Sequence, residues 1–175
     1  MVAVFGSSRT RPGESDYDTA VLCGRLLATA GFTVATGGYG GTMEAASRGA
    51  AEAGGAVVAV TAPPLFPMRS GPNEFAQSED PRPTLTTRLS GLLDDSVGTI
   101  SLPGSIGTFT ELMVAWNRAF LEELGDRPAH PVVAVGPKWA ELVAHLATEL
   151  GSGHLVTTVD TVEAAVAHLV EALNG

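Results

Sequence analysis

A strand, a glycine-containing turn and the start of a helix follow one another in residues 98–111, GTISLPGSIGTFTE, and this stretch decides the fold. The apolar run 98–102 is typical of a buried strand, and apolar residues at helical spacing follow Thr108. The glycines of the turn allow backbone N–H groups to approach an oxyanion, and the helix dipole favours negative charge at the start of the helix. The stretch therefore predicts an anion site at the carboxyl end of a strand, with the carboxylate of Glu111 close to it.

Strands and helices alternate along the chain on both sides of this stretch. Strands are predicted at 2–5, 33–36, 57–60, 98–102, 131–135 and 155–159, and helices at 16–30, 42–53, 84–94, 108–124, 138–150 and 161–173. Short, continuous apolar strands between helices are typical of a parallel sheet that is covered on both faces. We therefore expect a doubly wound, Rossmann-like α/β fold in which residues 1–175 form a single nucleotide-binding domain.

The segment 62–83 departs from this alternation, because it contains six prolines. A connection of this length is more often a binding loop or a lid than a simple linker. Arg69 and Arg82 in this segment, and Arg88 in the helix that follows, are candidates for binding a phosphate, because a planar guanidinium can contact two oxyanion atoms at once.

Composition narrows the class of partner. A net charge of −9 at pH 7 argues against nucleic acid, whose binding needs a basic surface, although a nucleotide needs only a local positive pocket. The single cysteine, Cys23, excludes an intrachain disulfide, and the four histidines lack the spacing of metal ligands. The sequence shows neither a charged-then-apolar leader nor an apolar run of about 18 residues. We expect a cytoplasmic protein with no metal, no cofactor and no membrane partner.

The glycine-rich stretch GYGGTM at 38–43 invites comparison with the dinucleotide-binding motif G-x-G-x-x-G. It has the first two glycines, but Met43 stands at the third position. The next predicted strand ends without the acidic residue that would hold a ribose hydroxyl, and no lysine follows the glycines as it does in a P-loop. The pattern therefore argues against a dinucleotide and against a P-loop.

Glu111 has a structural interpretation as well as a functional one. Thr108-x-x-Glu111 has the spacing of a capping box, in which the glutamate binds the backbone at the start of the helix. The turn that precedes it, Pro103-Gly104-Ser105-Ile106-Gly107, favours the functional interpretation, because it is suited to an anion.

Taken together, the motifs and their order resemble those of the LOG family. The resemblance rests on Gly6-Ser7-Ser8, on residues 37–46 (GGYGGTMEAA), on Arg88 and on residues 103–111, and it spans roughly residues 2 to 170. LOG proteins are cytokinin riboside 5′-monophosphate phosphoribohydrolases that were long labelled lysine decarboxylases. The resemblance implies a Rossmann-like fold, a homodimer or a dimer of dimers, and hydrolysis of the N-glycosidic bond of a nucleoside 5′-monophosphate.

The resemblance also implies roles for individual residues. The catalytic arginine and glutamate of the family correspond to Arg88 and Glu111, and Leu85, Leu89 and Ser105 stand where the family pattern has methionine, lysine and glycine. We expect the substrate and its phosphate to be bound by Ser7, Ser8, Gly38, Gly40, Gly41, Thr42, Glu44, Gly104, Ser105, Ile106, Gly107 and Thr108.

The expected activity is therefore hydrolysis of AMP or an N6-substituted AMP to free base and ribose 5-phosphate, with ionised Glu111 stabilising the positive charge that develops on the sugar. Glu44 is the one motif residue that could protonate the leaving base. An alternative is a non-catalytic nucleotide-binding protein or a molybdenum-cofactor carrier on the same fold, in which Glu111 has no chemical role. A third hypothesis is a sensing module for a nucleotide or a phosphorylated sugar within a larger assembly.

Overall fold

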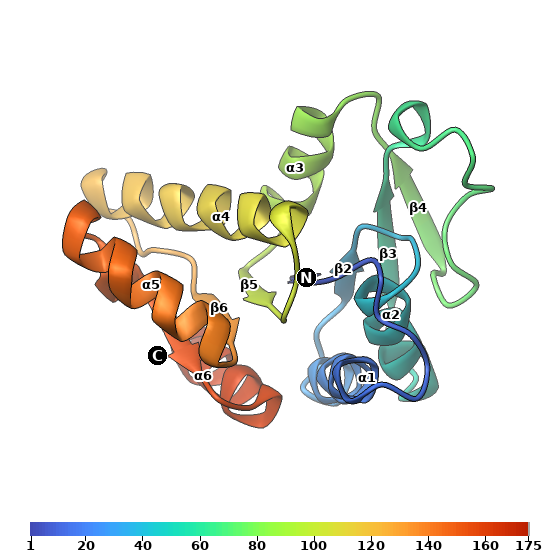
Figure 1. Cartoon of the computed structure of the whole chain (residues 1–175), viewed down its shortest axis with the longest axis horizontal. Coiled ribbons are helices and arrows are strands. Elements are labelled where there is room, and N and C mark those ends of the chain that lie inside the picture. The colour runs from blue at the N-terminus through green and yellow to red at the C-terminus, as the bar shows by residue number, and fades with distance from the viewer. Residues whose placement is uncertain (175) are drawn as a thin grey trace.

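Seven parallel strands form one sheet in the order β4-β3-β2-β1-β5-β6-β7 (Figure 1), in a computed structural model that describes residues 1–174. The strands are β1 Val2–Phe5, β2 Val34–Thr36, β3 Val57–Thr61, β4 Ser78–Pro81, β5 Gly98–Ser101, β6 Val132–Val135 and β7 Val156–Val159. The α-helices are α1 Ser15–Thr29, α2 Thr42–Glu52, α3 Leu85–Leu93, α4 Ile106–Leu124, α5 Pro137–Leu150 and α6 Val162–Asn174, with short 3-10 turns η1 Pro63–Leu65 and η2 Gly153–Leu155. This arrangement confirms the predicted doubly wound, Rossmann-like α/β fold.

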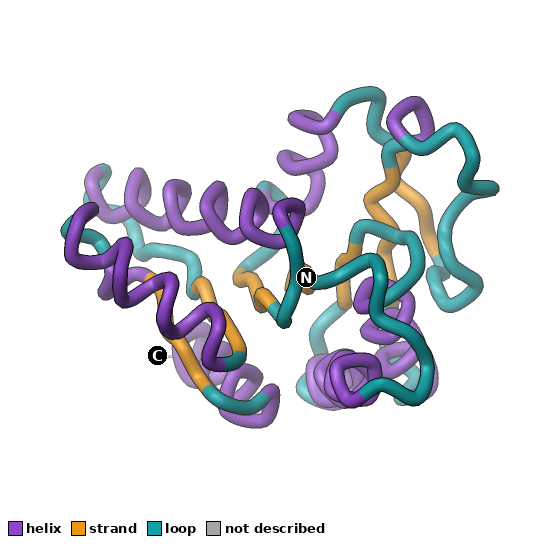
Figure 2. The backbone as a smooth tube through the Cα atoms, viewed as in Figure 1, coloured by secondary structure: helices purple, strands orange, loops and turns teal. Residues whose placement is uncertain are grey.

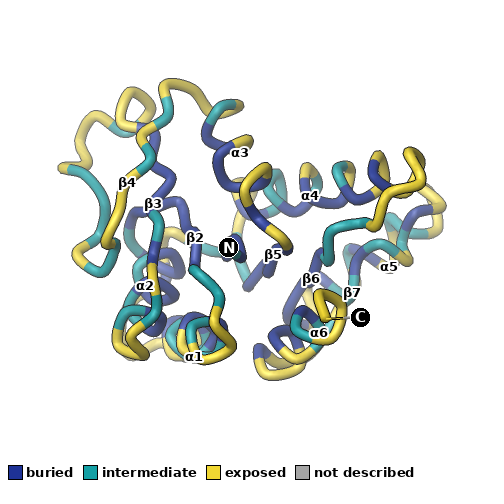
Figure 3. The backbone as a smooth tube through the Cα atoms, turned by 180° about the vertical axis from the view of Figure 1, so that it is seen from behind, coloured by how far each residue is buried: buried dark blue, intermediate teal, exposed yellow. Residues whose placement is uncertain are grey.

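Successive side chains of each buried strand point to opposite faces of the sheet, so both faces are apolar. Helices cover both of these faces (Figure 2). In β1, Val2 and Val4 join the core beneath α1, α2 and α6, whereas Ala3 and Phe5 join the core beneath α3, α4 and α5. Figure 3 shows the consequence, with buried residues on the strands and inner helix faces and exposed residues on the outer turns. None of the helices in residues 1–174 is long and apolar enough to span a membrane.

The order of strands reverses at the centre of the sheet. From β1 the chain builds β2, β3 and β4 on one side, then returns through α3 to place β5 on the other side of β1. In open α/β sheets, ligands bind outside the carboxyl ends of the strands that flank such a reversal. The turns predicted to bind the substrate follow β1, β2 and β5, so the topology brings them to the same end of the central strands.

The edge strand β4 was not predicted, because the whole of 62–83 was interpreted as a loop or lid. The segment contains η1 and β4 as well as the loop between them, residues 66–77 (Figure 2). β4 has the sequence Ser78-Glu79-Asp80-Pro81, is mostly exposed and pairs with β3 alone, so it has no apolar pattern to reveal it. Its proline closes the strand at the sheet edge, where proline is tolerated.

Candidate functional site

A cavity of about 130 Å³ lies in the crevice at the carboxyl ends of the central strands. Its walls come from the turn after β1, the turn after β2, the loop after β3, the inner side of α3 and the start of α4. The lining residues are Val4, Phe5, Gly6, Ser8, Gly37, Tyr39, Met43, Phe66, Arg69, Arg88, Ser105, Gly107, Thr108 and Glu111. The cavity therefore brings both predicted catalytic residues, Arg88 and Glu111, together with part of the predicted anion-binding turn.

Arg88 is buried on the inner side of α3, and main-chain oxygens hold its guanidinium in place. Its Nε donates a hydrogen bond to the carbonyl of Val60 at 2.9 Å, and its Nη2 donates one to the carbonyl of Gly37 at 3.2 Å. The remaining Nη1 faces the carboxylate of Glu111, with 3.9 Å between Nη1 and Oε1. Two of the three guanidinium nitrogens thus position the side chain, and the third faces the cavity.

Gly37 makes room for this arginine. A Cβ atom at position 37 would lie 1.8 Å from Nη2 of Arg88 and 2.7 Å from Sδ of Met43. No such contact is sterically possible, so a side chain at this position would displace the guanidinium. The glycine-rich stretch after β2 therefore serves the placement of Arg88.

Glu111 lies in the second turn of α4 and is largely shielded from water. Burial disfavours its ionised form and raises its pKa to about 7, although the neighbouring Arg88 acts in the opposite direction. A carboxyl group that titrates near neutral pH in a cavity is suited to acid–base chemistry, and such shifts are common at functional sites.

The start of α4 leaves its backbone N–H groups without a side-chain cap. Ser105 occupies the cap position and makes no capping hydrogen bond, and α4 begins at Ile106, two residues earlier than predicted. Glu111 is consequently too far into the helix to form the capping box considered for Thr108 and Glu111. The hydroxyl of Thr108 is buried and has no hydrogen-bond partner within residues 1–174. Uncapped N–H groups and an unsatisfied hydroxyl are together suited to bind an oxyanion.

Other predicted residues of the glycine-rich turns hold these turns to each other. The backbone N–H of Thr42 donates to the carbonyl of Ser7 at 2.8 Å, and the hydroxyl of Thr42 lies 3.2 Å from that of Thr10. Gly41 adopts a φ of 73° against the carbonyl of Ser7, where a Cβ atom would lie 2.3 Å from the oxygen. Ser7 and Thr42 therefore join the turns after β1 and β2, and neither lines the cavity.

The remaining predicted residues lie around the cavity. Glu44 and Gly40 line an adjoining hollow of about 370 Å³, which shares Ser8, Tyr39 and Arg69 with the cavity. The carboxylate of Glu44 accepts a hydrogen bond from the Tyr17 hydroxyl at 3.0 Å, away from Glu111. Gly38 adopts a φ of 80° beside β3. Gly104 lines a separate hollow together with Ser7. Ile106 is 77% exposed.

Comparison with known proteins places the chain in a family. Residues 43–173 match the family described as "Possible lysine decarboxylase", and residues 1–64 match the SLOG cluster4 family. The first of these matches covers most of the chain, so the chain belongs to that LOG-like family. The LOG-like protein is also 33% identical, over 115 residues, to an uncharacterised protein of Archaeoglobus fulgidus, with 66% of this chain and 72% of that protein covered.

Solved structures share the fold of the LOG-like protein along nearly its whole length. The molybdenum cofactor binding protein of Rippkaea orientalis is 22% identical, with a TM-score of 0.78 and with 99% of this chain and 96% of that chain covered. The molybdenum cofactor carrier protein of Chlamydomonas reinhardtii is 23% identical, with a TM-score of 0.75 and with 99% and 98% covered. At these identities the likeness supports the fold.

The three candidate arginines occupy different places in the LOG-like protein. Arg82 contacts Asp80 of β4 through its Nη2 at 2.6 Å and does not line the cavity, whereas Arg69 joins Arg88 in the lining. Sequence reasoning missed the aromatic side chains Tyr39 and Phe66, which surround Arg69. No local pattern marks them, because they come from separate loops that meet only in the folded chain.

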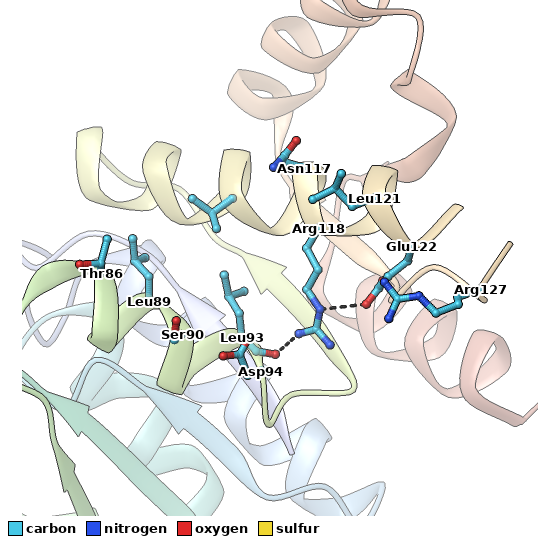
Figure 4. Close-up of a pocket in the computed structure, with 11 residues that line it drawn as sticks. Thr86, Leu89, Ser90, Leu93, Asp94, Asn117, Arg118, Leu121, Glu122 and Arg127 are labelled. Atoms are coloured by element: carbon cyan, nitrogen blue, oxygen red, sulfur yellow. Dashed lines mark hydrogen bonds and ion pairs between the residues drawn. The ribbon is translucent and has the colours of Figure 1, made fainter. Parts of the chain in front are cut away.

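A larger hollow of about 560 Å³ lies between α3 and α4 (Figure 4), and it shares no lining residue with the cavity. Its lining includes Arg118 and Glu122, which form an ion pair at 3.0 Å. The Glu122 carboxylate also lies 2.7 Å from Nδ1 of the His130 imidazole. Leu89 lines this hollow and not the cavity. Leu89, which stands where the family pattern has lysine, therefore does not line the cavity that contains Glu111.

Proposed function

We propose that the LOG-like protein hydrolyses the N-glycosidic bond of a nucleoside 5′-monophosphate, either AMP or an N6-substituted AMP. The observation that supports this most strongly is the buried pair of Arg88 and Glu111 beside the uncapped start of α4. The start of α4, which is suited to bind a phosphate, and a carboxyl group whose pKa burial raises to about 7 line the same cavity, and this combination supports the proposed reaction.

The 5′-phosphate would bind at the start of α4. The backbone N–H groups between Gly104 and Thr108 supply donors, the helix dipole adds a favourable field, and the buried Thr108 hydroxyl gains its missing partner. Gly104 allows a close approach, since a Cβ atom there would lie 2.1 Å from the Thr108 hydroxyl oxygen. In this position the phosphate fixes the ribose next to Glu111.

Glu111 would act on the ribose and on the attacking water. As the C1′–N bond breaks, positive charge develops on the sugar ring, and an ionised carboxylate stabilises it. The carboxylate accepts a proton from the water whose oxygen bonds to C1′, while the base leaves with the electrons of the C–N bond and is protonated at its nitrogen. The products are free base and ribose 5-phosphate. Arg88 anchors the sugar or its phosphate and orients Glu111.

The base would extend toward Ser8 and the 66–77 loop, where the adjoining hollow opens. The cavity alone is small for a whole nucleotide, but the adjoining hollow shares three of its lining residues, Ser8, Tyr39 and Arg69. Glu44 lies in the second space, so it remains the candidate for donating a proton to the leaving base.

A second candidate function is carriage of the molybdenum cofactor. The carrier and binding proteins of Chlamydomonas and Rippkaea share the fold over nearly all of both chains, and Ser105 departs from the family's catalytic motif. The cavity offers hydroxyl, amide and guanidinium groups, and residues 1–174 contain no cluster of three metal-binding side chains. Such a cargo would be held through its anionic groups at the start of α4, with Glu111 playing no chemical part.

Turnover separates the two functions. Purified protein is incubated with AMP and with N6-isopentenyl-AMP, and chromatography measures free base and ribose 5-phosphate. The hydrolase predicts release of base that falls by about two to four orders of magnitude in Glu111→Gln, the range typical of a lost general base, while affinity for AMP is largely retained. Nucleotide binding without release of base, or equal release by Glu111→Gln, would overturn the hydrolase and favour the carrier.

The expected homodimer remains a proposal, and the hollow between α3 and α4 is the surface we assign to it. Val114 and Leu121 of α4 line this hollow and are 37% and 51% exposed. Exposed apolar side chains in one region are typical of an association surface. Light scattering should give twice the monomer mass for the wild type and a single chain for Leu121→Glu; a monomeric wild type would contradict the assignment.

A further inference from the structure

Arg69 lies at the open side of the cavity, where aromatic rings hold its guanidinium. Its Cζ lies 4.4 Å from the centre of the Tyr39 ring and 5.0 Å from that of Phe66, and the two rings meet edge to face at 5.0 Å. The hydroxyl of Tyr39 accepts a hydrogen bond from the backbone N–H of Ala62 at 2.9 Å, which fixes the ring at the end of β3. Arg69 is thus positioned by stacking on a ring that is itself anchored.

The donors of Arg69 are free, in contrast to those of Arg88. Within residues 1–174 the Arg69 guanidinium forms neither an ion pair nor a hydrogen bond, whereas Arg88 binds two carbonyls and faces Glu111. A guanidinium has five N–H donors and is suited to bind a planar or tetrahedral oxyanion through two of them. Stacking leaves all five of these donors available.

The charges around the cavity are unbalanced. Two guanidinium groups, those of Arg69 and Arg88, line it together with one carboxylate, that of Glu111. Both cations are near the Tyr39 ring, since Cζ of Arg88 lies 5.9 Å from its centre, and repulsion from Arg69 contributes to lowering the pKa of Arg88 below its ordinary value, after the larger effect of burial. This local excess of positive charge occurs in a chain with a net charge of −9. The cavity is therefore built to receive an anion.

The loop that carries Arg69 is fixed near its end. The backbone N–H of Asn73 donates to the carbonyl of Gly38 at 2.7 Å, and its side-chain amide donates to the same carbonyl at 3.1 Å and to that of Tyr39 at 3.3 Å. These bonds tie the loop to the glycine-rich turn after β2. Arg69 lines the cavity together with Ser105 and Thr108, the residues of the α4 start.

We propose that Arg69 is a second ligand-binding cation, which binds the phosphate of the nucleotide from the open side while the start of α4 binds it from within. This inference rests on the proposed function for the identity of the ligand. A phosphate monoester carries between one and two negative charges near pH 7, enough to bind both groups at once. Tyr39 and Phe66 act as positioning residues, because they hold the guanidinium over the cavity before the ligand arrives.

Affinity for ribose 5-phosphate tests the proposal without any need for turnover. Calorimetry compares the wild type, Arg69→Ala and the matched control Arg127→Ala, which also removes one exposed arginine that has no ion pair within residues 1–174 but lines the hollow between α3 and α4. We expect Arg69→Ala to weaken binding by about ten- to a hundredfold and to reduce its dependence on salt, and Arg127→Ala to change it by less than about twofold. Circular dichroism and thermal melting verify that each variant is folded.

Three results would overturn the role of Arg69. One is equal affinity in Arg69→Ala and Arg127→Ala, and another is tighter binding in Arg69→Ala, which would mean that the stacked guanidinium blocks the cavity. The third is absence of ribose 5-phosphate binding by the wild type. Hydrolysis of AMP by the wild type, measured in parallel, decides the proposed function separately, because a hydrolase in which Arg69→Ala binds normally loses only this inference.

Discussion

Nη1 of Arg88 lies 3.9 Å from Oε1 of Glu111, and only 8% and 13% of the two side chains are exposed. Arg88 lies on α3 and Glu111 on α4, the helices that precede and follow the strand β5 beside β1. The arginine favours the ionised form of the carboxyl group, but burial disfavours it more strongly, so the pKa of Glu111 rises to about 7. Small changes in pH or in structure can therefore change the ionisation state of Glu111.

The dependence of turnover on pH follows from this balance. If ionised Glu111 stabilises the developing charge, kcat/KM for AMP should be lost as pH falls, with a rising limb centred near pH 7 and a slope of one on a logarithmic plot. The measurement is initial rates of base release between pH 5 and 9. Activity that increases as pH falls below 7 would show that the protonated carboxyl group is the reactive form.

The phosphate of AMP also titrates, with a pKa of about 6, and needs its own control. Binding of AMP to Glu111→Gln, measured over the same pH range, reports the titration of the ligand alone. The limb assigned to Glu111 should be absent from that binding curve.

The carboxyl group of Glu111 should make the folded protein less stable as pH rises, whereas a carboxyl group with a lowered pKa makes it more stable. Its pKa is about 7 in the folded protein and near the ordinary value of 4.5 when unfolded, so its favourable contribution is present below pH 4.5 and is lost as pH rises through 7. Glu111→Gln carries no charge and should be more stable than the wild type at pH 8, by up to about 3 kcal/mol, and nearly equal at about pH 4. Urea unfolding at the two pH values measures the difference, and a variant less stable at pH 8 would contradict it.

Gly37→Ala should damage the site without unfolding the protein. The added methyl group would lie 1.8 Å from Nη2 of Arg88, and the flexible end of the arginine must move away. Displacing a positioning group by about an ångström can lower kcat/KM by about a hundredfold. The matched control is Gly125→Ala, because a Cβ atom there comes no closer than 3.4 Å to any neighbour. Equal activity in both variants would show that Arg88 tolerates the displacement.

Glu122→Gln should destabilise the fold, because Glu122 is buried and joins Arg118 to His130. Burial raises the pKa of Glu122, but the backbone N–H and imidazole of His130 and the guanidinium of Arg118 outweigh it, so the pKa lies below the ordinary value. We expect a loss of about 1–3 kcal/mol at neutral pH that shrinks as pH falls below 4.5.

The neighbouring Glu123→Gln is the matched control for Glu122→Gln. Glu123 contacts His154 on the surface, where both side chains are about half exposed, so its loss should cost less than about 1 kcal/mol. Urea unfolding of both variants measures the contrast, and equal losses would mean that the Arg118–Glu122–His130 contacts contribute nothing beyond a surface pair.

The parts of the fold that the sequence predicts are those with a strong local pattern. β1, β3, β5 and β6 are short apolar runs, and α4 has apolar residues at helical spacing, so each was placed within two residues of its observed bounds. β4 has no such pattern, since Ser78-Glu79-Asp80-Pro81 becomes a strand only through its pairing with β3. α4 starts at Ile106 and not at the predicted Thr108, because the helix begins directly after Ser105 of the glycine-containing turn.

The candidate site likewise contains residues that the sequence predicts and contacts that it does not. Arg88 and Glu111 were predicted from motifs, and the fold brings them within one cavity. The stacking of Arg69 on Tyr39 and Phe66 could not be predicted, because it depends on how the loop after β3 lies over the turn after β2. Long-range loop contacts of this kind leave no periodic signal in the sequence.

The main-chain anchoring of Arg88 has an evolutionary consequence. The acceptors of its hydrogen bonds are the carbonyls of Val60 and Gly37, and every amino acid at position 60 would present the same oxygen. The side chains of β3 can therefore diverge, and the loops at the mouth can acquire new ligand preferences, while the cation keeps its place. Gly37 is the exception, since the space that it leaves empty is occupied by the arginine itself.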